Sequence, residues 1–206
     1  MKRIARIIKD PEVRAAELLD AARQLFSAVG YEKTMITDIT QKAGVAKGTF
    51  YYYFPTKEAV LKAIMADHAA KFVSRFNDNV SNASAVYKLK FFIENLYIPS
   101  NIDAVFHQLR VENRFDLFHT ICKEGDKVLK PLLADVIKQG NQENAMHVLL
   151  IDETIAFLWK TLECLWESQY NKEAPEIFAG KVNIAEVVLE QILGMTPGTF
   201  QLAISL

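Results

Sequence analysis

The residues best suited to chemistry lie close together, between Thr34 and Lys57. They combine hydroxyl groups, amines and a glycine, and they are Lys47, Gly48, Thr49, Tyr51, Tyr52, Tyr53 and Lys57. Hydroxyl groups can bond phosphate oxygens, and an ammonium can reach a phosphate or the edge of a guanine. A glycine lets the backbone approach a phosphate closely. The set therefore predicts contacts with the backbone and bases of DNA.

Two short helical patterns position these residues. Apolar side chains recur at three- and four-residue spacings over residues 36–43 and so share one helix face. Gly44 then permits the left-handed conformation that ends a helix. In the second pattern, Phe50 and Phe54 mark the inner face, so Tyr52 points to the opposite side. Two short helices with a glycine turn fit a helix-turn-helix, whose second helix lies in the major groove.

A glycine between two amphipathic helices also occurs in helical proteins that bind no DNA. The three tyrosines at positions 51–53 favour the nucleic-acid interpretation. Three consecutive residues span most of a helix circumference, so their rings cannot all be buried, and a packed core offers few partners for three hydroxyl groups.

The same stretch resembles the DNA-binding domain of the TetR family of bacterial repressors, over roughly residues 11 to 62. The resemblance is carried by Gly30-Tyr31, Thr34, Asp38-Ile39, Ala43-Gly44-Val45, Lys47-Gly48-Thr49-Phe50-Tyr51-Tyr52-Tyr53-Phe54 and Lys57-Glu58. By position, it implies a base contact from Lys47, a close approach at Gly48, and phosphate contacts from Thr37, Thr49, Tyr51, Tyr53 and Lys57.

Three positions depart from the family pattern. Met35 stands where a second threonine is frequent, Thr40 where alanine is usual, and Ala46 where a serine commonly caps the recognition helix. Loss of that capping hydroxyl should cost about 1 kcal/mol of helix stability. It also removes one phosphate contact, so the departures concern the details of operator recognition.

The charge of the chain is unevenly distributed. The 206 residues carry a net charge of only −1, which alone argues against a nucleic-acid binder. Residues 1–62, however, hold 11 Lys and Arg against 7 Asp and Glu, a net +4, while the remainder holds 13 against 18, a net −5. A basic N-terminal part on an acidic body fits a DNA reader. We expect a DNA-binding domain over residues 1–62 and an effector-binding and dimerisation domain over residues 63–206.

Other protein classes find little support in the sequence. Cys122 and Cys164 lie far apart within apolar patterns, which predicts buried free thiols rather than a disulfide or a zinc site. The four histidines are dispersed, and no phosphate loop or nucleophile elbow occurs, so we expect no catalytic site, metal or cofactor. No stretch reaches the ~20 apolar residues of a membrane span. The sequence predicts a soluble cytoplasmic protein that is not an enzyme.

The periodicity predicts an all-α fold, with a three-helix helix-turn-helix domain followed by a larger helical domain. Pro11–Val29 is the expected support helix, and a long helix runs from Thr56, its N-cap, to about Asn79. Five further helices are predicted near Ala85–Tyr97, Asp103–Cys122, Asp126–Lys138, Ala145–Tyr170 and Pro175–Leu193.

The last two predicted helices carry more apolar surface than one core needs. Such helices predict a four-helix bundle between two subunits, and a large monomer core is the alternative. The expected dimerisation residues are Ile151, Ile155, Leu158, Leu162, Leu165, Ile184, Val188 and Ile192. The family resemblance also implies a homodimer, which would present two recognition helices ~34 Å apart to a near-palindromic site.

The family resemblance further implies a small-molecule effector, of unknown identity, bound in the body. Polar groups within apolar walls can orient a ligand, and the residues that fit this description are Phe106, Arg110, Asn113, Trp159, Glu163 and Trp166. A cationic amphiphile could use the two tryptophans and the carboxylate. The alternative is that Glu163 faces water and the tryptophans only fill space.

The sequence therefore predicts a DNA-binding transcriptional regulator, a repressor that binds its operator as a dimer and is released by an effector. Release requires an effector that binds better to a form unable to fit the operator. An activator or a DNA-binding protein without an effector are the alternatives, and an enzyme is the competing class.

Overall fold

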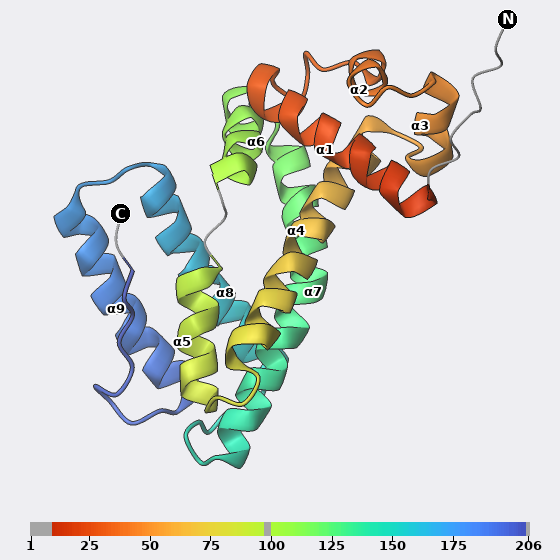
Figure 1. Cartoon of the computed structure of the whole chain (residues 1–206). Coiled ribbons are helices and arrows are strands. Elements are labelled where there is room, and N and C mark those ends of the chain that lie inside the picture. The colour runs from red at the N-terminus through yellow and green to blue at the C-terminus, as the bar shows by residue number, and fades with distance from the viewer. Residues whose placement is uncertain (1–9, 97–99, 205–206) are drawn as a thin grey trace, which may run out of the picture. The chain divides into compact units, whose positions relative to one another are not determined.

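The structure is a computed structural model that describes residues 10–96 and 100–204 (Figure 1). Over these residues the fold is all-α, as the periodicity predicts, and no strand occurs in them. The helices are α1 (Pro11–Val29), α2 (Ile36–Lys42), α3 (Lys47–Tyr53), α4 (Lys57–Val80), α5 (Ala85–Asn95), α6 (Ser100–Val111), α7 (Phe115–Gln142), α8 (Ile151–Tyr170) and α9 (Pro175–Leu193).

The helices form two compact units that are not consecutive along the chain. Unit 1 comprises residues 1–68 and 98–125, and unit 2 comprises residues 69–97 and 126–206. Helices α4 and α7 contribute residues to both units. A functional division of the chain at Lys62 stays a prediction.

Unit 1 is built around an apolar core beneath the helix-turn-helix. Leu18, Phe26, Ile39 and Phe50 are fully buried in this core, together with residues of α4, α6 and α7. Helix α1 packs against α2 and α6, and α2 packs against α3. Helices α2 and α3 are too short to be stable alone, so their packing against α1 and against each other must hold them in place.

Unit 2 has its own core, rich in aromatic residues. Phe72, Phe92 and Trp159 belong to it, and the Phe72 and Phe92 rings meet edge to face with centroids 5.3 Å apart. Helices α8 and α9 pack against each other. The segment after α9 runs back along that helix (Figure 1).

Local capping explains where the first helices begin and end. The Asp10 side chain accepts a hydrogen bond from the Glu12 N–H at 2.9 Å, and Pro11 occupies the first helical position of α1. Gly30 ends α1 at φ 95°, a backbone conformation that is open almost only to glycine. The predicted cap of α4 is confirmed, because the Thr56 Oγ1 accepts from the Ala59 N–H at 3.0 Å.

The prediction of separate helices at Asp103–Cys122 and Asp126–Lys138 is wrong. The break lies earlier, between α6 and α7, where Asn113 adopts φ 54°. Helix α7 instead continues through Gly125 and Pro131. The reason is burial: residues at four-residue spacing, Leu117, Ile121, Gly125, Leu129 and Leu133, are all buried along this helix. Packing along such a stripe outweighs the weak helix propensities of glycine and proline.

Helix α8 begins later than the sequence pattern predicts, at Ile151 instead of Ala145. Side-chain bonds hold the preceding residues in a turn. The Asn141 amide accepts from the Val148 N–H at 2.9 Å and donates to the Val148 carbonyl at 2.7 Å. The His147 N–H donates to the Leu193 carbonyl at 2.8 Å, at the end of α9.

Candidate nucleic-acid interface

The turn between α2 and α3 has the geometry that the glycine predicts. Gly44 adopts φ 66°, its N–H donates to the Gln41 carbonyl at 3.1 Å, and the Val45 N–H donates to the Thr40 carbonyl at 2.9 Å. This pair of hydrogen bonds is the Schellman motif, which ends a helix and reverses the chain. The second helix therefore starts at a fixed angle to the first.

Burial of two phenylalanines orients α3. Phe50 and Phe54 are buried, and the neighbouring Tyr51 and Tyr52 are 48% and 78% exposed. Tyr53 is half-buried against the core of unit 1, with its ring at 89° to that of Tyr52 and the centroids 4.9 Å apart. The three tyrosines are thus divided as their consecutive positions require, with Tyr52 pointing furthest into solvent.

The other residues of the predicted DNA face surround these rings. Thr37, Lys47 and Gly48 are exposed, and Thr49 is half-buried. A side chain added at Gly48 would meet no atom within 4 Å, so packing inside the chain does not require glycine there. Ala46, at the start of α3, provides no side-chain cap. DNA contacts from these residues stay predictions.

Lys57 is engaged inside the protein. Its ammonium donates to the carbonyl oxygens of Tyr31 at 2.6 Å, Thr34 at 3.0 Å and Glu32 at 3.4 Å. The ammonium also lies 4.1 Å from the centroid of the Tyr31 ring. Burial lowers the pKa of Lys57, against the opposing effect of the Glu112 carboxylate. These three bonds occupy the donors of the ammonium. The phosphate contact implied for Lys57 stays a prediction.

Sequence reasoning missed two residues that complete this cluster, Glu112 and Arg114 in the turn between α6 and α7. The Glu112 carboxylate accepts from the Glu32 N–H at 3.2 and 3.3 Å. Arg114 pairs with the carboxylate of Glu32 and with Asp116 at 3.0 Å. Glu112 is 80 residues from Glu32 and Arg114 lies two residues further on, so neither leaves a local signal and only the fold could reveal them.

The six predicted effector-binding residues fall in different units. Phe106, Arg110 and Asn113 belong to unit 1, where Arg110 lies over the Phe118 ring at 4.8 Å and Asn113 is exposed in the turn between α6 and α7. Trp159, Glu163 and Trp166 belong to unit 2. An effector contact from any of the six stays a prediction.

Within unit 2, the two tryptophans meet edge to face with centroids 5.6 Å apart. The chain itself supplies a cation beside Trp159, since the Lys130 ammonium lies 5.3 Å from the centroid of that ring. Glu163 pairs with Lys160 at 2.5 Å near the surface. This arrangement agrees better with the alternative in which Glu163 faces water.

The assignment of the α8 stripe to the subunit interface needs correction. The chain's own cores bury Ile155, Leu158, Leu162 and Leu165, because α8 packs this stripe against other residues of unit 2. Of the other predicted interface residues, Ile184 is 66% exposed, and Ile151, Val188 and Ile192 are half-buried. The large apolar side chains exposed on the two helices are Phe157, Ile177, Ile184 and Val187.

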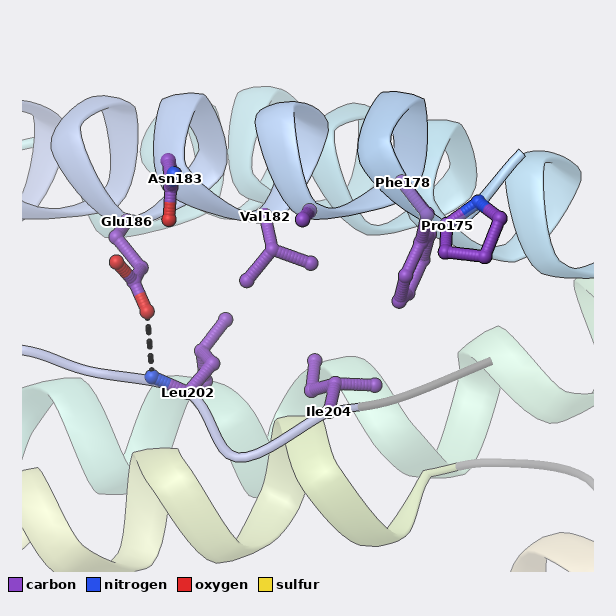
Figure 2. Close-up of a pocket in the computed structure, with 8 residues that line it drawn as sticks. Pro175, Phe178, Val182, Asn183, Glu186, Leu202 and Ile204 are labelled. Carbon is purple, nitrogen blue, oxygen red and sulfur yellow. Dashed lines mark hydrogen bonds between the residues drawn. The ribbon is translucent and has the colours of Figure 1, made fainter. Parts of the chain in front are cut away.

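A groove of about 350 Å³ lies between α9 and the C-terminal segment (Figure 2). Phe178 and Val182 line the α9 side, and Leu202 and Ile204 line the other. The Glu186 carboxylate, also at the groove, accepts from the Leu202 N–H at 2.7 Å and so holds the segment in place. None of the six predicted effector-binding residues lines this groove.

Further expectations concern thiols, metals and membranes. Cys122 is half-buried and Cys164 is exposed, so the prediction that both thiols are buried is wrong, because Cys164 lies on the outer side of α8. Among the described residues, no group of three or more His, Cys, Asp or Glu could hold a metal ion. None of the helices over the described part of the chain is long and apolar enough to span a membrane.

Comparisons with known proteins agree with this geometry. The family model described as "Bacterial regulatory proteins, tetR family" matches residues 18–64, which include α2 and α3. The "Fatty acid metabolism regulator protein" of Bacillus subtilis is 25% identical over 167 residues, covering 72% of this chain and 84% of the relative.

Solved structures show the same fold. Salmonella enterica GusR has a TM-score of 0.67 at 18% identity, covering 91% of this chain and 98% of that one. The transcriptional regulator FadR from Bacillus subtilis, solved in complex with stearoyl-CoA, has a TM-score of 0.61 at 23% identity, covering 86% and 97% of the two chains.

The Tyr31 cluster leads to a pH prediction. Burial, aided by the Glu58 carboxylate, raises the pKa of Tyr31 from 10.0 to about 12. The unfolded chain therefore loses this proton first, and the stabilisation present below pH 10 disappears as the pH rises to about 12. Tyr31→Phe removes the hydroxyl group that titrates. Between pH 10 and about 12, the unfolding free energy of the wild type should therefore fall by about 1 to 2 kcal/mol more than that of the variant. Urea unfolding at several pH values measures the difference, and equal losses would contradict the prediction.

Proposed function

Since this chain belongs to the TetR family of transcriptional regulators, we propose that it binds operator DNA as a homodimer, represses transcription there, and is released by a small-molecule effector. It is a regulator and not an enzyme, and the relatives to which it is similar are regulators too. A regulator of this kind acts where the chromosome is, so we propose a cytoplasmic location.

The outward face of α3 carries the proposal for DNA binding. Tyr51 and Tyr52 are exposed to solvent and are not buried in the core. Lys47 and Gly48 lie in the first turn of α3, where a helix in the major groove approaches the bases. The open space around Gly48 leaves room for the close approach of a DNA backbone. The exposed Thr37 hydroxyl and the Thr49 hydroxyl add two phosphate contacts.

Lys47→Ala should weaken binding to the DNA that flanks the coding region by about tenfold. It should also reduce the slope of log affinity against log salt by about 0.9 for each phosphate that the protein no longer neutralises. Lys138→Ala, which removes an exposed lysine of unit 2, is the matched control and should change neither quantity. Fluorescence anisotropy at several salt concentrations measures both. Wild-type protein that fails to bind duplex DNA even at low salt would end the proposal.

The dimer is supported by apolar surface that unit 2 leaves exposed. Phe157 on α8 is 71% exposed and Ile184 on α9 is 66% exposed, and Ile177 and Val187 add to the α9 surface. Helices α8 and α9 pack side by side within the subunit. Two such pairs related by a twofold axis form a four-helix bundle that removes these side chains from water. A twofold dimer presents two α3 helices to half-sites ~34 Å apart.

Ile184→Glu should convert the dimer to monomer, because a carboxylate would be buried without a partner in the bundle. Val111→Glu is the matched control, since Val111 is similarly exposed but lies on α6 in unit 1. Sedimentation velocity measures the mass of each variant. A wild-type protein that sediments as a monomer, or an Ile184→Glu variant that stays dimeric, would contradict this interface.

We propose that the effector contains a long apolar chain. The support comes from the resemblance to a regulator of fatty acid metabolism and to FadR, which was solved with stearoyl-CoA. Repression requires the effector to prefer a form of the dimer that does not fit the operator, because equal affinity for both forms shifts nothing. If the ligand instead favoured the DNA-bound form, the protein would be an activator, or a repressor that needs the ligand as a corepressor.

Stearoyl-CoA should therefore release the protein from its operator, with affinity falling about 5- to 150-fold, the usual range of allosteric coupling. Coenzyme A without the acyl chain is the control and should have no effect. Anisotropy of labelled operator DNA during titration with each compound gives the answer. Tight operator binding that ignores acyl-CoA would exclude this effector class while leaving DNA binding intact.

A further inference from the structure

We propose that Lys57 is a positioning residue, whose ammonium holds the loop between α1 and α2 in place beneath the helix-turn-helix, instead of neutralising a DNA phosphate. The inference rests on the proposed DNA-binding function and deepens it, because it separates the residue that sets the position of α2 and α3 from the residues that touch DNA.

The coordination of the ammonium is the first observation. An ammonium carries three donors, and three carbonyl oxygens accept from Lys57, those of Tyr31, Glu32 and Thr34. The Tyr31 ring covers the ammonium on a further side, at 4.1 Å. A phosphate oxygen would have to displace one of these partners.

The loop needs these donors because it is partly buried and non-helical. Tyr31 and Thr34 are buried, and buried carbonyl groups without partners cost free energy. The Thr34 hydroxyl donates to the Gly30 carbonyl at 2.6 Å, and the Thr34 N–H donates to the Tyr31 carbonyl at 3.3 Å. Lys57 supplies the further donors for the carbonyl groups of this loop. Helix α2 begins directly after the loop, at Ile36.

The same loop is also held by the turn between α6 and α7. Its Glu32 N–H bonds the Glu112 carboxylate, and the Glu32 side chain pairs with Arg114. The carbonyl groups of the loop are therefore bound by the start of α4, and its Glu32 N–H is bound by the turn between α6 and α7. Because α2 follows directly after this loop, the positions of α2 and α3 depend on both sets of contacts, those of Lys57 and those of Glu112 and Arg114.

An arginine cannot replace this lysine. The ammonium is a compact point charge whose donors can converge on three carbonyls, whereas a guanidinium is planar and presents its donors as a fork. Arginine does, however, bind phosphate at least as well as lysine does. The Lys57→Arg variant therefore separates positioning from phosphate contact.

The experiment compares three variants of the full-length protein. If Lys57 positions the loop, Lys57→Met and Lys57→Arg should both weaken binding to operator DNA about 10- to 100-fold, the effect of losing charge-assisted hydrogen bonds. Both should also speed amide hydrogen exchange over residues 31–42 in the protein without DNA. Lys62→Met is the matched control, because Lys62 lies on the same helix and pairs with the surface residue Glu58, at 2.7 Å. It should leave the exchange rates unchanged.

Two results would overturn the inference: wild-type affinity in Lys57→Arg together with weakened binding in Lys57→Met, or unchanged exchange over residues 31–42 in both variants. If Lys57→Met shows no helical circular dichroism signal and so fails to fold, the test rests on Lys57→Arg, which keeps the positive charge. Wild-type protein that does not bind DNA would defeat the proposed function instead. In that case hydrogen exchange in the free protein still tests the positioning role.

Discussion

The burial of Phe50 and Phe54 is the constraint on which the DNA-facing surface depends. Both rings are held in the core of unit 1, and their burial fixes the rotation of this seven-residue helix about its own axis. With that rotation fixed, Tyr52 must point outward and Tyr53 must lie along the edge of the core. A core packing interaction thereby decides which hydroxyl groups are available to a partner.

The identity of the helix-turn-helix could be predicted from sequence because its determinants are local. Phe50, Phe54 and Gly44 act within one or two helical turns, so their spacing alone orients α3. The role of Lys57 could not be predicted, because its carbonyl partners lie 23 to 26 residues away in a loop without periodic side chains. The motif gives the position of Lys57 in the sequence, but the carbonyl oxygens around its ammonium determine its role.

The errors in the body have a related cause. Apolar spacing in α8 shows which residues share a face, but it cannot tell whether that face meets the chain itself or another subunit. Leu158 and Leu162 meet the chain itself, while Phe157, one position away, is exposed. The continuity of α7 was hidden for the same reason, since Gly125 and Pro131 are local signals that tertiary burial overrides.

The acidic surplus of the second part of the chain also has a structural use. Several of its carboxylates accept hydrogen bonds from backbone N–H groups outside the regular hydrogen-bond pattern of helices. Glu190 binds those of Gly198 and Phe200 at 2.8 and 2.7 Å, and Glu143 binds that of Ala85 at 2.9 Å. These bonds lower the pKa of Glu190, and the pKa of Glu143 is lowered by the hydrogen bond from the Gln139 amide and then by that from the Ala85 N–H. The folded state therefore favours the charged forms of both carboxyl groups. The Glu112 carboxylate likewise accepts from a backbone N–H, that of Glu32 in the loop ahead of α2, so a carboxylate from the acidic part of the sequence helps to position the helix-turn-helix.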